Sequence, residues 1–162
     1  MNIAIAHDMD LIKEIVTAPG MWESMAEDGV TPDQFVAENT PFSFWLLATV
    51  SDKVCGIILV NVETSISFKV HPHMLKEFAG KGYLMIKELF RWFLRETTDL
   101  SNKICITTPT FNKAGYKLAV KLGFKDEGLS RQSYKKNGEI FDQYILGITR
   151  DEVKEVVRCQ HS

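Results

Sequence analysis

The chain has 162 residues, 45% of them hydrophobic and 25% charged, a balance that fits one globular domain, predicted over residues 1–150 with a short charged tail at 151–162. Its formal net charge of −2 leaves no excess of positive charge for a phosphate backbone, so nucleic acid is not an expected partner. The apolar runs are far shorter than the ~20 residues of a membrane span, and the first residues lack a secretory pattern, so we expect neither membrane insertion nor export.

The first part of the chain predicts a strand and two helices. Residues 2–6 are short and apolar, and the apolar positions of residues 9–16 recur at helical spacing until a Pro-Gly pair stops the pattern. Thr31 and Pro32 are typical of a helix start, so we expect a short second helix that runs to about Glu38.

Three antiparallel strands are predicted next. Residues 44–50 and 54–62 are rich in aromatic and β-branched side chains, and the polar segment between them predicts a hairpin. Over residues 64–70 apolar and polar side chains alternate, which predicts a strand with one buried face. Residues 71–79 are polar and predict a loop.

The second half of the chain begins with its best amphipathic helix, which follows Gly82. Residues 103–107 predict a fifth strand, residues 112–122 a helix, and the Asn-Gly pair at 137–138 a turn between two final strands. This order predicts an α/β (α+β) fold, with a mixed, mostly antiparallel seven-stranded sheet flanked by about four helices.

Gly80, Lys81 and Gly82 stand between a strand and the start of that amphipathic helix. Glycines in such a place let backbone N–H groups approach an anion, and the helix dipole adds a partial positive charge. A tight turn without a ligand is the alternative. The chain has no Walker loop and no third glycine at Rossmann spacing, so those two nucleotide-binding classes are not indicated.

Residues 70–90 resemble motif A of the GNAT acetyltransferase superfamily, in which a V-x-P strand end leads to a Q/R-x-x-G-x-G/A loop and an amphipathic helix; residues 77–82 match the loop. Residues 112–124 resemble the family's N-x-x-A-x-x-x-Y-x-K-x-G-F segment. Residues 123–146 look like the branch that contains ribosomal-protein alanine N-acetyltransferases. Short GNAT-like chains of this kind are also similar to proteins encoded by tailed phages.

The resemblance implies the GNAT fold and acetyl-CoA as co-substrate, bound between two diverging parallel strands, here residues 64–70 and 103–107. Glu77 departs from the family's Gln or Arg and would repel the pyrophosphate, and Ala119 stands where many members carry a tyrosine that protonates the leaving thiolate. The coenzyme-binding residues that the resemblance implies are Val70, Ala79, Gly80, Lys81, Gly82, Tyr83, Asn112 and Lys121.

Acetyl transfer to an amine needs a base that removes a proton and a group that receives charge from the thioester. Glu63 is our first candidate for the base, with a solvated carboxylate at a strand end as the alternative. Tyr116 lies about one helical turn before Ala119 and is the candidate hydroxyl, with simple packing at a helix edge as the alternative.

A metal site is not expected. His71 and His73 have no acidic or cysteine partner nearby, so they are interpreted as loop residues rather than zinc ligands. Cys55, Cys105 and Cys159 form no C-x-x-C pair, and we expect them to be reduced, as in a cytoplasmic protein.

Two functions stay open at this point. The first is an N-acetyltransferase that moves the acetyl group of acetyl-CoA to a primary amine of a small molecule or a protein N-terminus by direct attack. The second is a non-catalytic or weakly active binding or assembly module with the same fold, for example in phage particle assembly. Glu77 and Ala119 favour the module, whereas Gly80, Gly82 and Asn112 favour the enzyme. The amine acceptor is unknown, and a homodimer is an open alternative.

Overall fold

The computed structural model describes residues 1–159 and contains one seven-stranded sheet in the order β1-β2-β3-β4-β5-β7-β6. The strands are β1 (Asn2–Ile5), β2 (Ser43–Val50), β3 (Lys53–Thr64), β4 (Ser67–Met74), β5 (Lys103–Pro109), β6 (Lys125–Lys136) and β7 (Glu139–Thr149). The helices are α1 (Met9–Thr17), α2 (Met21–Met25), α3 (Gly82–Glu96), α4 (Lys113–Lys121) and α5 (Arg150–Arg158), with 3₁₀ turns at η1 (Pro32–Gln34) and η2 (Lys76–Phe78).

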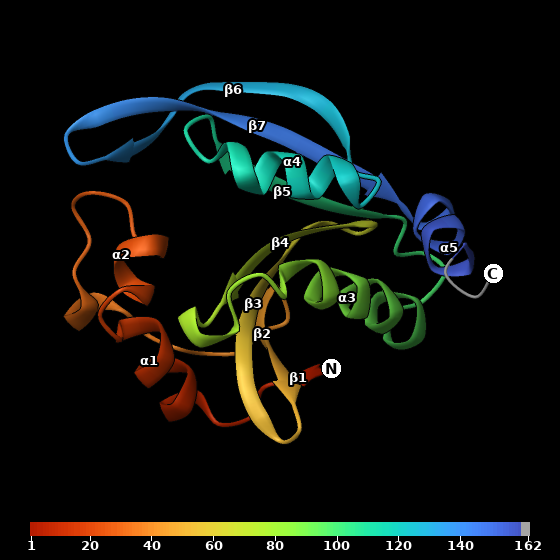
Figure 1. The fold of residues 1–162 in the computed structure, drawn as a ribbon, viewed down its shortest axis with the longest axis horizontal. Coiled ribbons are helices and arrows are strands. Elements are labelled where there is room, and N and C mark those ends of the chain that lie inside the picture. The colour runs from red at the N-terminus through yellow and green to blue at the C-terminus, as the bar shows by residue number, and fades with distance from the viewer. Residues whose placement is uncertain (160–162) are drawn as a thin grey trace.

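The sheet is mixed, as predicted. All neighbouring strands pair antiparallel except β4 and β5, which run parallel. Figure 1 shows β4 and β5 close together near α5 and diverging toward the side where α2 and the β6–β7 turn lie. The fold class is therefore confirmed, with five α-helices in the described residues where about four were expected. Among residues 1–159, no helix is long and apolar enough to cross a membrane.

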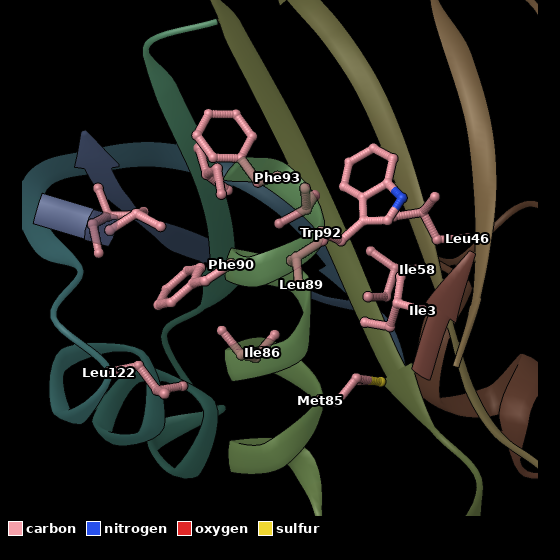
Figure 2. Close-up of a cluster of buried hydrophobic side chains, with 14 of the residues drawn as sticks. Ile3, Leu46, Ile58, Met85, Ile86, Leu89, Phe90, Trp92, Phe93 and Leu122 are labelled. Carbon is pink, nitrogen blue, oxygen red and sulfur yellow. The ribbon is translucent and has the colours of Figure 1, made fainter. Parts of the chain in front are cut away.

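Each face of the sheet has its own hydrophobic core. Helix α3 supplies Leu89 and Phe90, which are 1% and 0% exposed and pack with the sheet residues Leu46 and Ile58. Figure 2 shows these side chains between α3 and the strands, with Leu122 approaching α3 from the end of α4. On the opposite face, α1 covers a smaller cluster formed by Ile12, Val16, Trp45 and Ile57, among others.

Two predicted segments are corrected by the structure. The helix expected from Thr31 to Glu38 is a single 3₁₀ turn, because Phe35 leaves the helical path and packs edge-on against Trp22 and Trp45 at centroid distances of 6.2 and 6.0 Å. The loop expected over residues 71–79 begins later, because β4 continues through Met74 along β3.

The predicted charged tail is also corrected, since residues 150–158 form helix α5. Although this helix contains many charged residues, its Val153 is fully buried in the main core. The buried guanidinium of Arg150 donates to the carbonyl oxygens of Leu94 and Thr97 at 3.2 and 3.3 Å, at the negative end of the α3 dipole. Helix α5 is thus packed onto α3; residues 160–162 of the predicted tail lie outside the described residues.

Candidate active site

The site forms where β4 and β5 separate. Only three residue pairs join these strands, the last between Lys69 and Cys105, although β4 continues to Met74 and β5 to Pro109. A cavity of about 460 Å³ fills the space beyond the last pair. Because both strands are parallel, the helices that follow them, α3 and α4, begin at this same open end of the split.

The cavity passes through the sheet from one face to the other. Ile86 and Leu118 line it from α3 and α4, on the face of the main core. Ser24 and Met25 line it from α2, which packs on the opposite face. A long ligand can therefore lie on the α3–α4 side and present one end to a second molecule on the α2 side.

The edge of β4 that faces this split offers free backbone groups. The N–H of Leu75 donates to the carbonyl of Cys55 in β3 at 2.9 Å, so alternation directs the C=O groups of Val70 and Pro72 away from β3 and toward the cavity that both residues line. Pro72, which lacks an N–H, is tolerated here because β4 has lost β5 as a partner. This edge can hydrogen-bond an extended ligand.

The loop before α3 presents unpaired amides. The N–H groups of Gly80, Gly82, Tyr83 and Leu84 have no acceptor within the described chain, whereas that of Lys81 donates to the carbonyl of Phe78 at 3.1 Å. Gly80 has a φ of +89°, which favours glycine because it lacks a Cβ. Four free donors at a helix N-terminus form a cradle for an anion.

Lysines surround this loop. The ammonium groups of Lys87 and Lys121 lie over the Tyr83 ring, 4.9 and 5.5 Å from its centroid, and Lys81 lies 5.3 Å from that of Phe78. The exposed Glu77 is the opposing charge in η2. The predicted coenzyme residues Ala79 to Tyr83 and Lys121 are thus gathered around one N-terminus.

Helix α4 connects this loop to the cavity. A Cβ added to Gly82 would lie 3.3 Å from Cδ2 of Leu118, which lines the cavity. Asn112 also lines it and caps α4, since its side-chain oxygen accepts the N–H of Gly115 at 3.0 Å. Ala119 is buried and lines the same wall, so no hydroxyl comes from its position.

Two solved acetyltransferases share this architecture. The acetyltransferase of the GNAT family from Streptococcus pneumoniae matches with a TM-score of 0.70 at 19% identity, over 91% of this chain and 98% of that chain. Spermidine N-acetyltransferase from Vibrio cholerae, in complex with CoA and spermine, matches with a TM-score of 0.76 at 15% identity, over 94% and 97%. The chain has the GNAT fold.

The sequence comparisons are sparser. No protein-family model matches the chain. An uncharacterized N-acetyltransferase derived from the SPbeta prophage of Bacillus subtilis (strain 168) is 31% identical over 88 residues, which cover 53% of this chain and 49% of the relative. The chain thus spans about half the length of the curated relative that it matches. With the fold, this likeness supports the GNAT superfamily; the ribosomal-protein alanine branch and a phage origin stay predictions.

The two predicted catalytic residues do not line this GNAT-fold cavity. Glu63 is the next-to-last residue of β3 and pairs with Lys69 Nζ at 2.5 Å, near the closed end of the split. The hydroxyl of Tyr116 donates to Asp126 Oδ2 at 2.9 Å, and its ring packs on Tyr144 at a centroid distance of 4.4 Å. The hydrogen bond to Asp126 raises the pKa of Tyr116, and Tyr116 is not among the residues that line the cavity.

Two histidines that were not predicted as site residues line the cavity. His71 and His73 extend from β4 on the face opposite Val70 and line the cavity. Burial lowers the pKa of His73 to about 4, and nearby His71 adds to this effect. Burial and Lys69 also lower the pKa of His71. Both rings are therefore neutral at pH 7 and can accept a proton.

The sequence contained one signal for this site, because His71 and His73 are two residues apart and would share one face of a strand. This signal could be used only with the knowledge that β4 continues past Val70. Among residues 1–159, no three His, Cys, Asp or Glu side chains cluster as ligands for a metal ion. The cavity thus combines an anion cradle on one face with neutral imidazoles on the other.

Proposed function

We propose that the chain transfers the acetyl group of acetyl-CoA to a primary amine. The observation that carries this proposal is the cavity of about 460 Å³, which joins the split between β4 and β5 to both faces of the sheet. The solved structure of the Vibrio cholerae neighbour is a complex with CoA, which supports the choice of acetyl-CoA as co-substrate.

The residues present fit that co-substrate. The free amides of Gly80, Gly82, Tyr83 and Leu84 suit a pyrophosphate, and Lys121 adds positive charge beside them. The open edge of β4 at Val70 suits the amide groups of the pantetheine arm. Such an arm would enter the split and place the thioester within reach of the α2 side.

We assign the base to His71 rather than to Glu63. The imidazole lines the cavity, and the Glu63 carboxylate raises its pKa against the lowering effects of burial and Lys69. An imidazole whose pKa lies nearer the working pH is the better base, so His71 is favoured over His73, whose pKa is about 4. Glu63 then tunes the base without touching the substrate.

His71 alone can carry out the proton transfers that the reaction needs. The amine nitrogen attacks the thioester carbonyl carbon, the new C–N bond forms and the C–S bond breaks. His71 takes the proton that the nitrogen releases and returns it to the thiolate, a role that fits the absence of a hydroxyl at Ala119. The products are an N-acetyl amine and free CoA.

The binding or assembly module stays the alternative. It is supported by Ala119, which stands where many family members carry a tyrosine, and by the prophage origin of the matching relative. That origin also supports a phage-encoded source for this chain.

Calorimetric titration with acetyl-CoA and with CoA tests the binding step. We expect both to bind, and Gly82→Val to weaken both at least tenfold (about 1.4 kcal/mol), because its side chain fills the space over the free amides and presses on Leu118. Thermal unfolding of the variant is the control for folding. Equal affinity in Gly82→Val, or no heat with the wild type, would contradict the assigned anion cradle.

A further inference from the structure

One ionised side chain faces the cavity. Of the described residues that line it, Glu27 is the only Asp, Glu, Lys or Arg, and the two lining histidines are neutral at pH 7. Glu27 is exposed at the mouth on the α2 side and makes no hydrogen bond or ion pair within residues 1–159. The acceptor side of the cavity therefore carries a negative charge that has no partner among residues 1–159.

The backbone on both sides of Glu27 is anchored to the distant β6–β7 turn. The Asp28 carboxylate accepts the N–H groups of Asn137 and Gly138 at 2.9 and 2.7 Å. The Asp28 N–H donates to the carbonyl of Lys135 at 3.1 Å, and Lys136 Nζ donates to the carbonyl of Ala26. Figure 1 shows the chain after α2 reaching toward the tip of this hairpin. Glu27 is thus held at the mouth by its two neighbours.

Aromatic rings stand beside this carboxylate. Phe111 and Tyr134 line the cavity with ring centroids 5.9 Å apart, and Phe141 lies 4.7 Å from Phe111. Burial and the carboxylates of Glu27 and Asp28 raise the pKa of Tyr134, which places its phenol close to both. A carboxylate next to aromatic faces is the surface that binds an organic ammonium ion.

We propose that the acceptor is a small diamine or polyamine, which Glu27, Tyr134 and Phe111 recognise by a second, protonated amino group. This inference rests on the proposed acetyl transfer. The second group is needed because a carboxylate favours the charged form of a neighbouring amine, whereas the attacking nitrogen must be uncharged. One end of the acceptor stays charged at Glu27, and the other reaches the neutral His71 beyond it.

The test compares three acceptors with the same five-carbon chain: cadaverine, pentylamine and aminovalerate. In wild type, kcat/KM for cadaverine exceeds that for pentylamine about tenfold, the size expected of one exposed ion pair with an aromatic contact, and aminovalerate is the poorest. Glu27→Gln lowers the ratio of cadaverine to pentylamine to near one, and Glu27→Lys makes aminovalerate better than cadaverine. Glu23→Gln, an exposed carboxylate one turn earlier and outside the cavity lining, keeps the wild-type ratio.

Equal kcat/KM for cadaverine and pentylamine in wild type, or an unchanged ratio in Glu27→Gln, overturns the proposal. Calorimetry separates this result from failure of the acetyl transfer itself. If acetyl-CoA does not bind, or no amine is acetylated, the proposed function fails, and cadaverine is titrated into the protein directly. Saturable binding that Glu27→Gln weakens about tenfold supports the cation site, whereas equal binding of cadaverine by both proteins, or none, overturns it.

Discussion

Replacing His73 by glutamine should remove a large part of the acid sensitivity of the fold. His73 has a pKa of about 4 in the folded protein and a reference value of 6.5, so the unfolded chain takes up its proton first as the pH falls. The free energy of unfolding therefore decreases as the pH drops from 6.5 toward about 4 and is unaffected by this group above that interval. Each pH unit within the interval costs about 1.4 kcal/mol, which gives about 2 kcal/mol at a pH of about 5.

Urea unfolding followed by tryptophan fluorescence measures this difference at about pH 7.5 and about pH 5. Between these two conditions we expect wild type to lose about 2 kcal/mol more than His73→Gln. All other titrating groups are shared, so they cancel in the comparison of the two proteins. His7→Gln, an exposed histidine, should behave as wild type. Parallel losses in wild type and His73→Gln would show that the His73 ring titrates normally and that its burial in the cavity wall is not what we infer.

Two other predictions concern the coenzyme side and the base. Glu77→Arg should tighten acetyl-CoA binding about fivefold in calorimetry, because it reverses an exposed charge beside the anion cradle. Glu14→Arg on α1 is the matched control. Unchanged affinity in Glu77→Arg would mean that the phosphates bind elsewhere. His71→Gln should reduce kcat about a hundredfold without changing acetyl-CoA affinity, whereas Glu63→Gln should mainly shift the acidic limb of the kcat/KM profile to lower pH, because it removes the charge that raises the pKa of His71. A hundredfold loss in Glu63→Gln with an unshifted profile would restore Glu63 as the base.

Local patterns were sufficient for most of the fold. The hairpin between β2 and β3 and the Asn137–Gly138 turn depend on residues next to one another, and both form as predicted, the turn with φ of 52° and 80°. The apolar face of α3 follows from its own helical period. The turn at Gly80 could be predicted because a positive φ, which favours glycine, is a property of the local backbone.

The missed features depend on distant contacts. The Thr31–Pro32 start signal is present, but Phe35 is taken up by Trp22 and Trp45, which no local rule anticipates. The contact of Asp28 with the turn at Gly138 joins residues 110 positions apart.

The placement of His71 and His73 follows from two facts about β4 that only the sheet reveals. The strand continues along β3 after it has left β5, so its side chains keep alternating while one backbone edge becomes free. In the proposed function, the free edge and the anion cradle of α3 form the coenzyme side, and the alternating histidines form the acceptor side. Coenzyme binding and proton transfer would then depend on different atoms of one strand. A His71 variant that loses turnover but keeps its affinity for acetyl-CoA would therefore identify an enzyme. A wild type that binds acetyl-CoA but acetylates no amine would identify a binding module with the same fold.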